Sequence, residues 1–268
     1  MIRNSTMPLE RPLRRHAETG LALFVRNFRN LQEFNYTVHV SEEFNFIFFN
    51  NPKCGCSTTK ATLNMECARR LGLELRYATT NQIHARRHNV LKTPGQIGLR
   101  RFMAMLTDPA VVRFCVLREP VNRVVSAFSN KFGWNSPQRQ RFNVFVGRPA
   151  GSVWTVNEFA EAIASDMALR DFDEHWRLQF RQVCGALVDF TTIGFQETLD
   201  ADLQSFARSV FGTSIDICDV RQLFPKNRSG GDAMAQLSPR SRQLLLTAYA
   251  DDAEFYRREW ARKAASSS

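Results

Sequence analysis

The sequence predicts an α/β protein in which helices flank a parallel sheet. Strand-like runs alternate with helix-like segments, two of the runs break into a polar loop that leads into a helix, and the chain shows no internal repeat and no linker. The strand-like runs lie at residues 44–50, 111–117 and 187–195. The helix-like segments lie near Glu66 and at residues 156–167, 199–211 and 240–263. This alternation is typical of parallel strands that are joined by crossover helices.

Length and composition fit one enzyme-sized domain. The 268 residues are 44% hydrophobic, which is enough to bury one sizeable core. We expect an N-terminal arm and helix at residues 1–43, a single domain at 44–263 and a flexible tail at 264–268. A capping box starting at Thr155 and a cap followed by proline at Ser238 predict the starts of two helices.

The loop after the first strand-like run is small and rich in hydroxyl groups. An Asn-Asn-Pro turn ends the run, and the loop then carries Lys53 and Gly55. A helix is predicted from Ser57 onward by an apolar residue at every fourth position, namely Leu63, Cys67 and Leu71. Backbone N–H groups at a helix start favour an oxyanion. The loop lacks the second glycine and the late lysine of a Walker A sequence, and alone it fits a capped surface turn better than a phosphate site.

A second strand, turn and helix follow the run at residues 111–117. Pro120 suits the first turn of the helix, where its missing N–H costs nothing. The apolar face of this helix comprises Val121, Val124, Val125 and Phe128. Arg118 at the strand end and Ser126 two turns along the helix could then reach one phosphate. The alternative is an ordinary surface pair of Arg118 with Glu119.

Together these segments resemble the sulfotransferases that use 3′-phosphoadenosine 5′-phosphosulfate, and within them the carbohydrate sulfotransferase branch (sulfotransferase family 2-like). The loop at 52–58 is similar to the 5′-phosphosulfate loop of that family, and residues 118–131 are similar to its 3′-phosphate motif. Residues 174–179 resemble the H-W-R-P-Q block of the branch, with Leu178 in place of proline. Thr59 stands where relatives often carry an aromatic residue, and residues 132–154 have no counterpart.

The resemblance implies a sulfotransferase fold with a P-loop-like central parallel sheet and an activity of class EC 2.8.2. A sulfuryl group would pass in line from 3′-phosphoadenosine 5′-phosphosulfate to a carbohydrate hydroxyl, with Lys53 stabilising the leaving phosphate oxygen. Lys226 and Arg228 belong to a basic loop that is similar to one that closes over the nucleotide, and we expect it to become ordered on donor binding. The predicted donor-binding residues are Pro52, Lys53, Cys54, Gly55, Cys56, Ser57, Thr58, Arg118, Arg123, Ser126, Lys226 and Arg228.

The acceptor hydroxyl also needs a base, and histidine suits this task because its pKa lies near the operating pH. His175 is the leading candidate from its place in the H-W-R block, and His84 lies in a second segment similar to one near the acceptor. Packing beside Trp176 is the structural alternative for His175. Glu174 and Asp173 are further candidates.

No metal site is predicted. The spacing Cys54-Gly-Cys56 is neither a redox pair nor half of a zinc site, and His84 and His88 flank Arg86 and Arg87, whose charge disfavours a cation. We expect all six cysteines to be reduced thiols.

The formal net charge of +10 suits an anionic donor and, in part, an acidic glycan. The expected partner is a glycan acceptor, with acidic and lipid-linked glycans and peripheral membrane association as options and the oligomeric state left open. Nucleic acid is not expected as a partner, because no nucleic-acid-binding motif accompanies the charge. The longest apolar run near the N-terminus is far shorter than the roughly 20 residues of a spanning helix and shows no signal-peptide pattern. Relatives of this branch in eukaryotes are usually anchored in the Golgi, whereas this chain is expected to be a cytoplasmic, bacterial-type member.

Two other functions share part of this pattern. A P-loop-type kinase would have the same strand, loop and helix, but it would need a metal-binding acidic residue and a later lysine. A non-catalytic nucleotide- or glycan-binding module would keep Arg118 and Ser126 yet tolerate the loss of Lys53 and His175.

Overall fold

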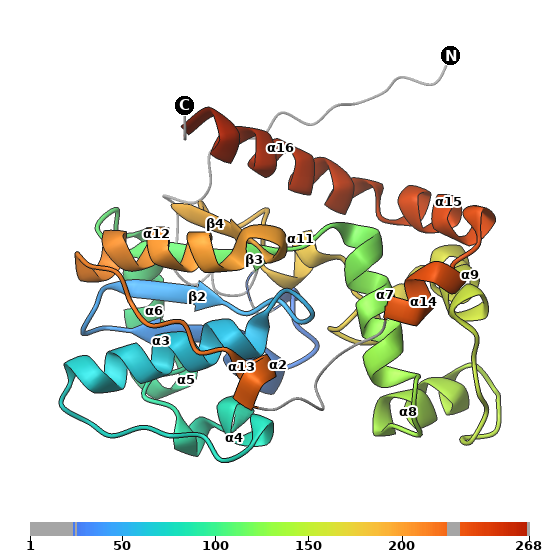
Figure 1. The fold of residues 1–268 in the computed structure, drawn as a ribbon, viewed down its shortest axis with the longest axis horizontal. Helices are drawn as coiled ribbons and strands as arrows, with labels where there is room; N and C mark the ends of the chain where they lie inside the picture. Colours follow the sequence, from blue (N-terminus) through green and yellow to red (C-terminus); the bar gives the residue numbers. More distant parts are fainter. Residues whose placement is uncertain (1–23, 25, 224–230, 267–268) are drawn as a thin grey trace.

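A four-stranded sheet forms the centre of the molecule in the computed structural model, which describes residue 24 and residues 26–223 and 231–266 (Figure 1). The strands lie in the order β1 (Val38–Ser41), β2 (Phe46–Phe49), β3 (Val112–Leu117) and β4 (Thr192–Phe195). β2, β3 and β4 are parallel, and β1 pairs antiparallel with β2. The predicted α/β fold with a mainly parallel sheet is confirmed.

The edges of the sheet differ from the sequence prediction. β1 lies within the predicted N-terminal arm, and its register with β2 joins Val38 to Phe49, so the sheet begins ahead of the expected boundary at residue 44. β1 is only four residues long, which is too short to give a clear alternating pattern. β4 is shorter than the predicted run at 187–195, because Cys184, with φ 59°, and the residues up to Val188 form turns instead of a strand.

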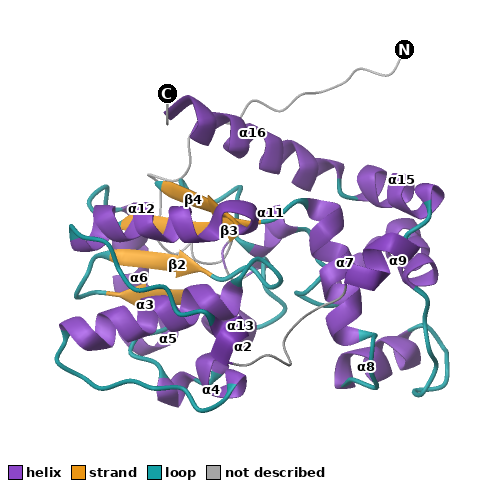
Figure 2. Cartoon of the chain, viewed as in Figure 1, coloured by secondary structure: helices purple, strands orange, loops and turns teal. Residues whose placement is uncertain are grey.

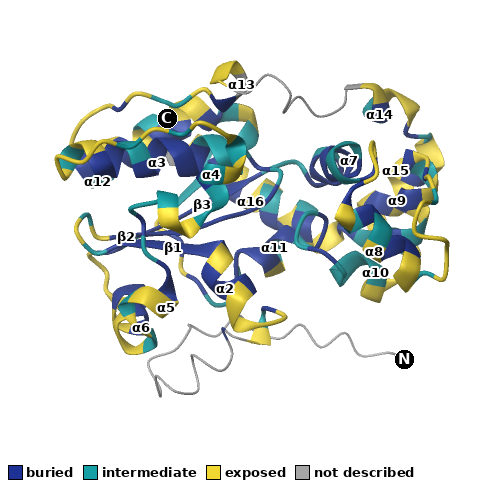
Figure 3. Cartoon of the chain, turned by 90° about the horizontal axis from the view of Figure 1, so that it is seen from below, coloured by how far each residue is buried: buried dark blue, intermediate teal, exposed yellow. Residues whose placement is uncertain are grey.

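Helices cover both faces of the sheet, as Figure 3 shows. Alternate strand residues point to opposite faces. One face packs on α3 (Cys56–Arg70) and α12 (Leu199–Phe211) through Phe46, Phe48, Phe114, Val116, Leu63, Leu203 and Phe206. The other face packs on α2 (Leu31–Thr37), α6 (Leu99–Thr107) and α16 (Ala250–Ser266) through Ile47, Phe49, Cys115, Leu117, Phe34, Phe102 and Phe255.

A group of helices beside the sheet forms a second hydrophobic cluster (Figure 2). Its members are α7 (Pro120–Lys131), α8 (Pro137–Phe145), α9 (Val156–Ser165), α10 (Met167–Asp171), α14 (Gly231–Gln236) and α15 (Pro239–Ala248). Trp176 is fully buried at its centre, where its ring meets Phe132, Phe142 and Phe159. The shorter elements are α4 (Thr80–His84), α5 (Pro94–Ile97), α11 (Gln179–Gln182), α13 (Val220–Leu223) and the 3-10 helices Arg86–His88 and Gln196–Thr198.

Several helix ends follow the sequence and others do not. The Thr155 capping box, the Ser238 cap and Pro120 at the first turn of α7 are confirmed. The single helix predicted at 240–263 is wrong. α15 ends at Ala248, and the buried hydroxyl of the next residue, Tyr249, donates to the carbonyl of Trp176 over 2.5 Å. α16 then runs to Ser266, through most of the predicted tail.

Leu71 does not belong to the buried face of α3. It is the C-cap residue and is 44% exposed, because the helix ends at Arg70. No helix in the described ranges is both long and apolar enough to cross a bilayer.

Candidate functional site

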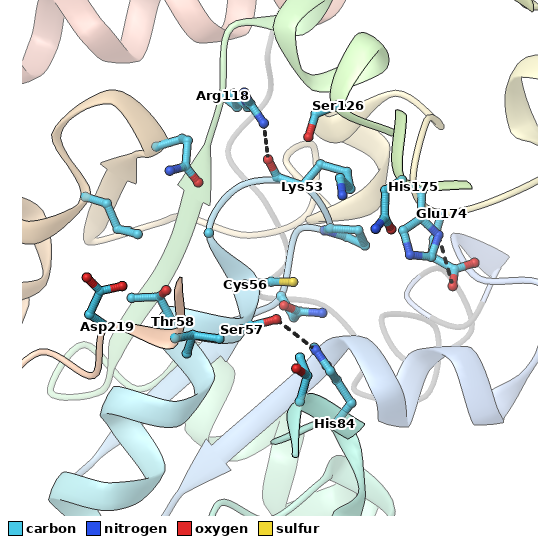
Figure 4. Close-up of a pocket in the computed structure, with 18 of the residues that line it drawn as sticks. Lys53, Cys56, Ser57, Thr58, His84, Arg118, Ser126, Glu174, His175 and Asp219 are labelled. Atoms are coloured by element: carbon cyan, nitrogen blue, oxygen red, sulfur yellow. Dashed lines mark hydrogen bonds and ion pairs between the residues drawn. The ribbon is translucent and has the colours of Figure 1, made fainter. Parts of the chain in front are cut away.

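A large cavity opens where β2 and β3 end and their loops lead into α3 and α7, at the carboxyl edge of the parallel strands (Figure 4). Its volume is about 1710 Å³. Crevices at this edge are the usual ligand sites of open α/β sheets. The cavity brings together ten of the residues predicted from sequence, namely Pro52, Lys53, Gly55, Cys56, Ser57, Thr58, His84, Arg118, Ser126 and His175.

The loop at 52–55 is a tight turn that precedes α3. Lys53 has φ 71° and Gly55 has φ 73°, so both lie in the left-handed region. A Cβ atom at Gly55 would come within 2.5 Å of Leu199 Cδ2 and 2.7 Å of Gln196 Oε1, which explains why this position needs glycine. Gly55 is also the N-cap of α3 and provides no side-chain cap, so the N-terminal N–H groups of the helix are available to an anion at the cavity.

Lys53 is the central cation of the cavity. Burial lowers its pKa to about 8, and the nearby charges of Lys131 and Arg118 act in the same direction. Among the described residues, neither Lys53 nor Lys131 has a carboxylate within ion-pair distance. The ammonium groups of Lys53 and Lys131 therefore favour an anionic ligand in this cavity.

Buried polar contacts join the two predicted phosphate-binding segments. Arg118 Nη1 donates to the carbonyl of Lys53 over 3.0 Å. The fully buried Gln179 donates to the carbonyl of Arg118 over 2.8 Å, and its Oε1 accepts from Asn51 Nδ2 and from the Arg118 N–H, each over 3.2 Å. Gln179, the last residue of the H-W-R-L-Q block, therefore sets the spacing between the loop and the end of β3.

Arg123 and Cys54 are placed beneath the loop, and neither lines the cavity. The buried Arg123 guanidinium donates to the carbonyls of Pro52, Arg177 and Glu174, over 3.0, 2.5 and 2.9 Å. The prediction that Arg123 contacts the donor is thus corrected, because all of these contacts are to backbone oxygens that support the loop. The buried Cys54 thiol faces the carbonyl of Pro52, at 3.7 Å.

His175 lines the cavity and forms a dyad with Asp173. Its Nδ1 lies 2.5 Å from Asp173 Oδ1, and its backbone N–H donates to the same oxygen over 3.0 Å. Burial raises the pKa of Asp173, but the hydrogen bonds from His175 outweigh this effect and hold the pKa of this carboxyl below its ordinary value. An ionised Asp173 accepts a hydrogen bond from the Nδ1–H group of His175. The other ring nitrogen, Nε2, is then the one that can take up a proton.

His84 has different surroundings. Its Nε2 lies 3.0 Å from Ser57 Oγ, and its Nδ1 lies 3.4 Å from the Tyr36 hydroxyl. Burial and the charge of Lys60 lower its pKa to about 3. His84 is therefore a neutral ring whose two nitrogens both have partners.

Comparison with known proteins agrees with this geometry. The profile of the Sulfotransferase family matches residues 36–257, which include every residue that lines the cavity. The chain belongs to the sulfotransferase family. The resemblance and the fold expected from it are confirmed.

Two curated relatives are similar to parts of this chain. Human carbohydrate sulfotransferase 14 is 33% identical over 101 residues, which cover 34% of this chain and 26% of the relative. Mouse carbohydrate sulfotransferase 14 is 27% identical over 181 residues, which cover 61% of this chain and 43% of the relative. The chain thus spans less than half the length of these relatives, and none of the solved structures matches it.

Three other predictions from the sequence concern the basic loop, the cysteines and a metal site. Lys226 and Arg228 lie outside the described residues. The six cysteines form no disulfide with one another. Within the described ranges, one group could offer three metal ligands, namely Asp173, Glu174 and His175, but Asp173 and His175 bind each other and Glu174 pairs with Arg29 over 2.6 Å.

Sequence reasoning missed several residues that the fold places at or behind the cavity. Tyr36, Lys131 and Trp134 line it, while Gln179 holds Arg118, which also lines it. Lys131 and Gln179 lie inside the recognised motifs, so the motifs could have signalled them. Tyr36 and Trp134 lie outside every motif, and only the fold brings them to the site.

Proposed function

We propose that this protein transfers a sulfuryl group from 3′-phosphoadenosine 5′-phosphosulfate to a hydroxyl of a carbohydrate. The observation that carries the proposal is a single cavity that holds the Lys53 loop, Arg118 with Ser126, and His175. The first two groups suit the two anionic ends of the donor, and the third suits the acceptor hydroxyl. A carbohydrate acceptor is supported by the two curated relatives, which are carbohydrate sulfotransferases.

The donor would be held at two points. The start of α3 offers backbone N–H groups and the hydroxyls of Ser57 and Thr58 to the phosphosulfate, beside the Lys53 ammonium. Arg118 and Ser126 would bind the 3′-phosphate. The hydrogen bond from Arg118 to the Lys53 carbonyl and the Gln179 contacts keep these two points at a constant spacing, so the sulfur is aligned by groups remote from it.

The donor supplies an activated sulfuryl group. The acceptor oxygen bonds to sulfur, the bond from sulfur to the bridging phosphate oxygen breaks, the hydroxyl proton goes to the base, and adenosine 3′,5′-bisphosphate leaves. Lys53 neutralises the charge that develops on the leaving oxygen. A group that stabilises this charge more in the transition state than in the ground state lowers the barrier.

His175 is the base in this proposal, and Asp173 is its positioning residue. The Asp173 carboxylate holds the Nδ1 proton and would stabilise the imidazolium that forms when Nε2 takes the hydroxyl proton. His84 is a poor base because its pKa is lowered to about 3. Its contact with Ser57 instead orients a hydroxyl at the start of α3.

The test uses labelled donor, a panel of polysaccharides and calorimetry with adenosine 3′,5′-bisphosphate. We expect transfer to at least one polysaccharide and binding of the bisphosphate, with both strongly reduced in Lys53→Ala and Arg118→Ala. Lys92→Ala and Arg101→Ala are matched controls, because these exposed residues pair with Glu42 away from the cavity and should leave both readouts unchanged. Failure of the wild type in both assays would reject the proposal.

The two alternative functions give different results. A non-catalytic module would bind the bisphosphate without transfer to any acceptor. A kinase would transfer phosphate from a nucleoside triphosphate and would need a divalent cation. The His175 and Asp173 dyad favours an enzyme over a binding module, since a module has no use for an oriented base.

A further inference from the structure

The cavity is larger than one nucleotide needs. Sites for small molecules usually enclose about 300–1,000 Å³, whereas this cavity has a volume of about 1710 Å³. Under the proposed function, on which this inference rests, the remaining space belongs to the acceptor. Besides the predicted donor-binding loop, the cavity is lined by residues from α2, α4, the C-terminal end of α7 and the segment after it, which include Tyr36, His84, Lys131, Trp134 and Gln138.

Trp134 is the most exposed aromatic side chain among the described residues, at 59%, and it lies on the wall of the cavity. Its indole N–H donates to the carbonyl of Asn130 over 2.9 Å, which restrains the ring. Ser126, Asn130 and Trp134 all line the cavity at intervals of four residues, so the wall built by α7 continues past the end of the helix.

The turn that carries Trp134 is tightly built. Gly133 packs so closely on α7 that an added Cβ would lie 2.6 Å from the carbonyl oxygen of Ser129. The Ser136 hydroxyl donates to the carbonyl of Lys131, and the buried Arg139 donates to the carbonyl of Phe132 over 3.2 Å. These contacts hold an exposed indole in a constant position, which a solvated surface residue would not require.

This turn also lies next to the residues that would carry out the transfer. Phe132 packs on Trp176 with ring centroids 5.8 Å apart, which brings the turn beside His175. Lys131 is close enough to Lys53 and to His84 for its charge to act on both. The amide side chains of Asn130 and Gln138 line the same wall and can bond to hydroxyl groups.

We propose that Trp134 is the platform on which a pyranose ring of the acceptor glycan stacks, with Asn130 and Gln138 bonding to its hydroxyl groups. The C–H face of a pyranose is apolar and slightly positive, and it complements the negative face of an indole. A rigid aromatic ring also provides a large contact area at a small entropic cost. This role accounts for the turn at 132–139, the first part of a segment that has no counterpart in the family motifs.

The experiment measures binding of glycans, separately from transfer. Hexasaccharides of a neutral glucan and of alternating hexuronate and N-acetylhexosamine are titrated by calorimetry into protein saturated with adenosine 3′,5′-bisphosphate. We expect the wild type to bind one of the two hexasaccharides. Trp134→Ala should weaken this binding by about tenfold or more, which is a typical loss when a stacking ring is removed. Trp134→Phe should retain most of the affinity.

Phe145→Ala is the matched control, because Phe145 is a 55% exposed aromatic residue of the same segment that does not line the cavity. Unchanged bisphosphate affinity in Trp134→Ala shows that this variant keeps its fold and donor site. Equal hexasaccharide affinity in Trp134→Ala and the wild type would overturn the inference, as would a wild type that binds neither hexasaccharide. Absence of bisphosphate binding in the wild type would instead reject the proposed function.

Discussion

At the scale of one residue, Lys53 shows how burial changes the pKa of a cation. It has a left-handed backbone conformation that costs a non-glycine residue about 1–2 kcal/mol, and it lies in a cavity wall where burial lowers its pKa. Both features are unfavourable for the isolated protein. A bound anion would relieve the second, because an opposite charge favours the protonated form.

The lowered pKa of Lys53 predicts the alkaline side of the pH profile. Only the ammonium can stabilise the leaving oxygen, so kcat/KM should fall as pH rises through about 8, the pKa of this lysine in the free enzyme. In Lys53→Arg, the cation persists to a much higher pH, and this fall should move beyond pH 9 or disappear. An unchanged fall near pH 8 in active Lys53→Arg would assign it to another group.

Asp173 gives a second prediction at this scale. Asp173→Asn removes the charge that would stabilise the His175 imidazolium, so kcat should fall by about tenfold or more while the KM for the donor stays the same. His175→Ala should lose about 10²-fold or more in kcat. Steady-state kinetics with labelled donor separates the two constants.

Asp171→Asn provides the control for Asp173→Asn, because Asp171 is a nearby carboxylate that pairs with the exposed Arg181 and lies outside the cavity. It should leave kcat unchanged. A rise in donor KM without a change in kcat would show that Asp173 only maintains the fold of the donor site.

At the scale of elements, the loop before α3 depends on close packing between Gly55 and the residues that follow β4. Leu199 begins α12 and Gln196 begins the short helix before it, so a segment far along the chain from Gly55 encloses this glycine. Sequence alone showed a small residue in a loop. The close approach that requires glycine became visible only when β4 and α12 were in place.

Gly55→Ala should therefore abolish high-affinity binding of adenosine 3′,5′-bisphosphate. The new methyl group must displace Leu199 and Gln196, or shift the loop away from the start of α3. Gly72→Ala is a matched control, because Gly72 has φ 72°, nearly the same as Gly55, but has open space around it. Both variants should lose about 1 kcal/mol of stability from the backbone conformation.

Calorimetry with the bisphosphate and thermal melts distinguish the two effects. The Gly72→Ala variant should melt at a lower temperature than the wild type yet bind with the same affinity. Equal affinity in Gly55→Ala would show that the loop can adapt, and that its position relative to α12 does not control the donor site.

At the scale of the whole molecule, the cavity lies between a sheet covered by helices and a helical cluster centred on Trp176. The sheet side provides the loop and Arg118, and the helical side provides Lys131 and His175. Buried polar contacts from Arg123 and Gln179 cross this boundary. The excess of positive charge over the chain suits the strongly anionic donor that we propose.

The sequence by itself determined the local units of this protein. Both strand, loop and helix units and the Thr155 and Ser238 caps follow from residues that are neighbours along the chain. Periodicity, turn chemistry and capping act over a few residues, so these features could be predicted without knowledge of the fold.

The tertiary structure decided which residues come into contact, which are buried and how their pKa values shift. It buried Arg123, placed Trp134 on the wall of the cavity, and gave His175 an aspartate partner while His84 became a weak base. It also ended α15 at Ala248, next to Tyr249, which bonds to Trp176. Burial, pKa and partner choice depend on segments distant in sequence, and for that reason the local pattern could not reveal them.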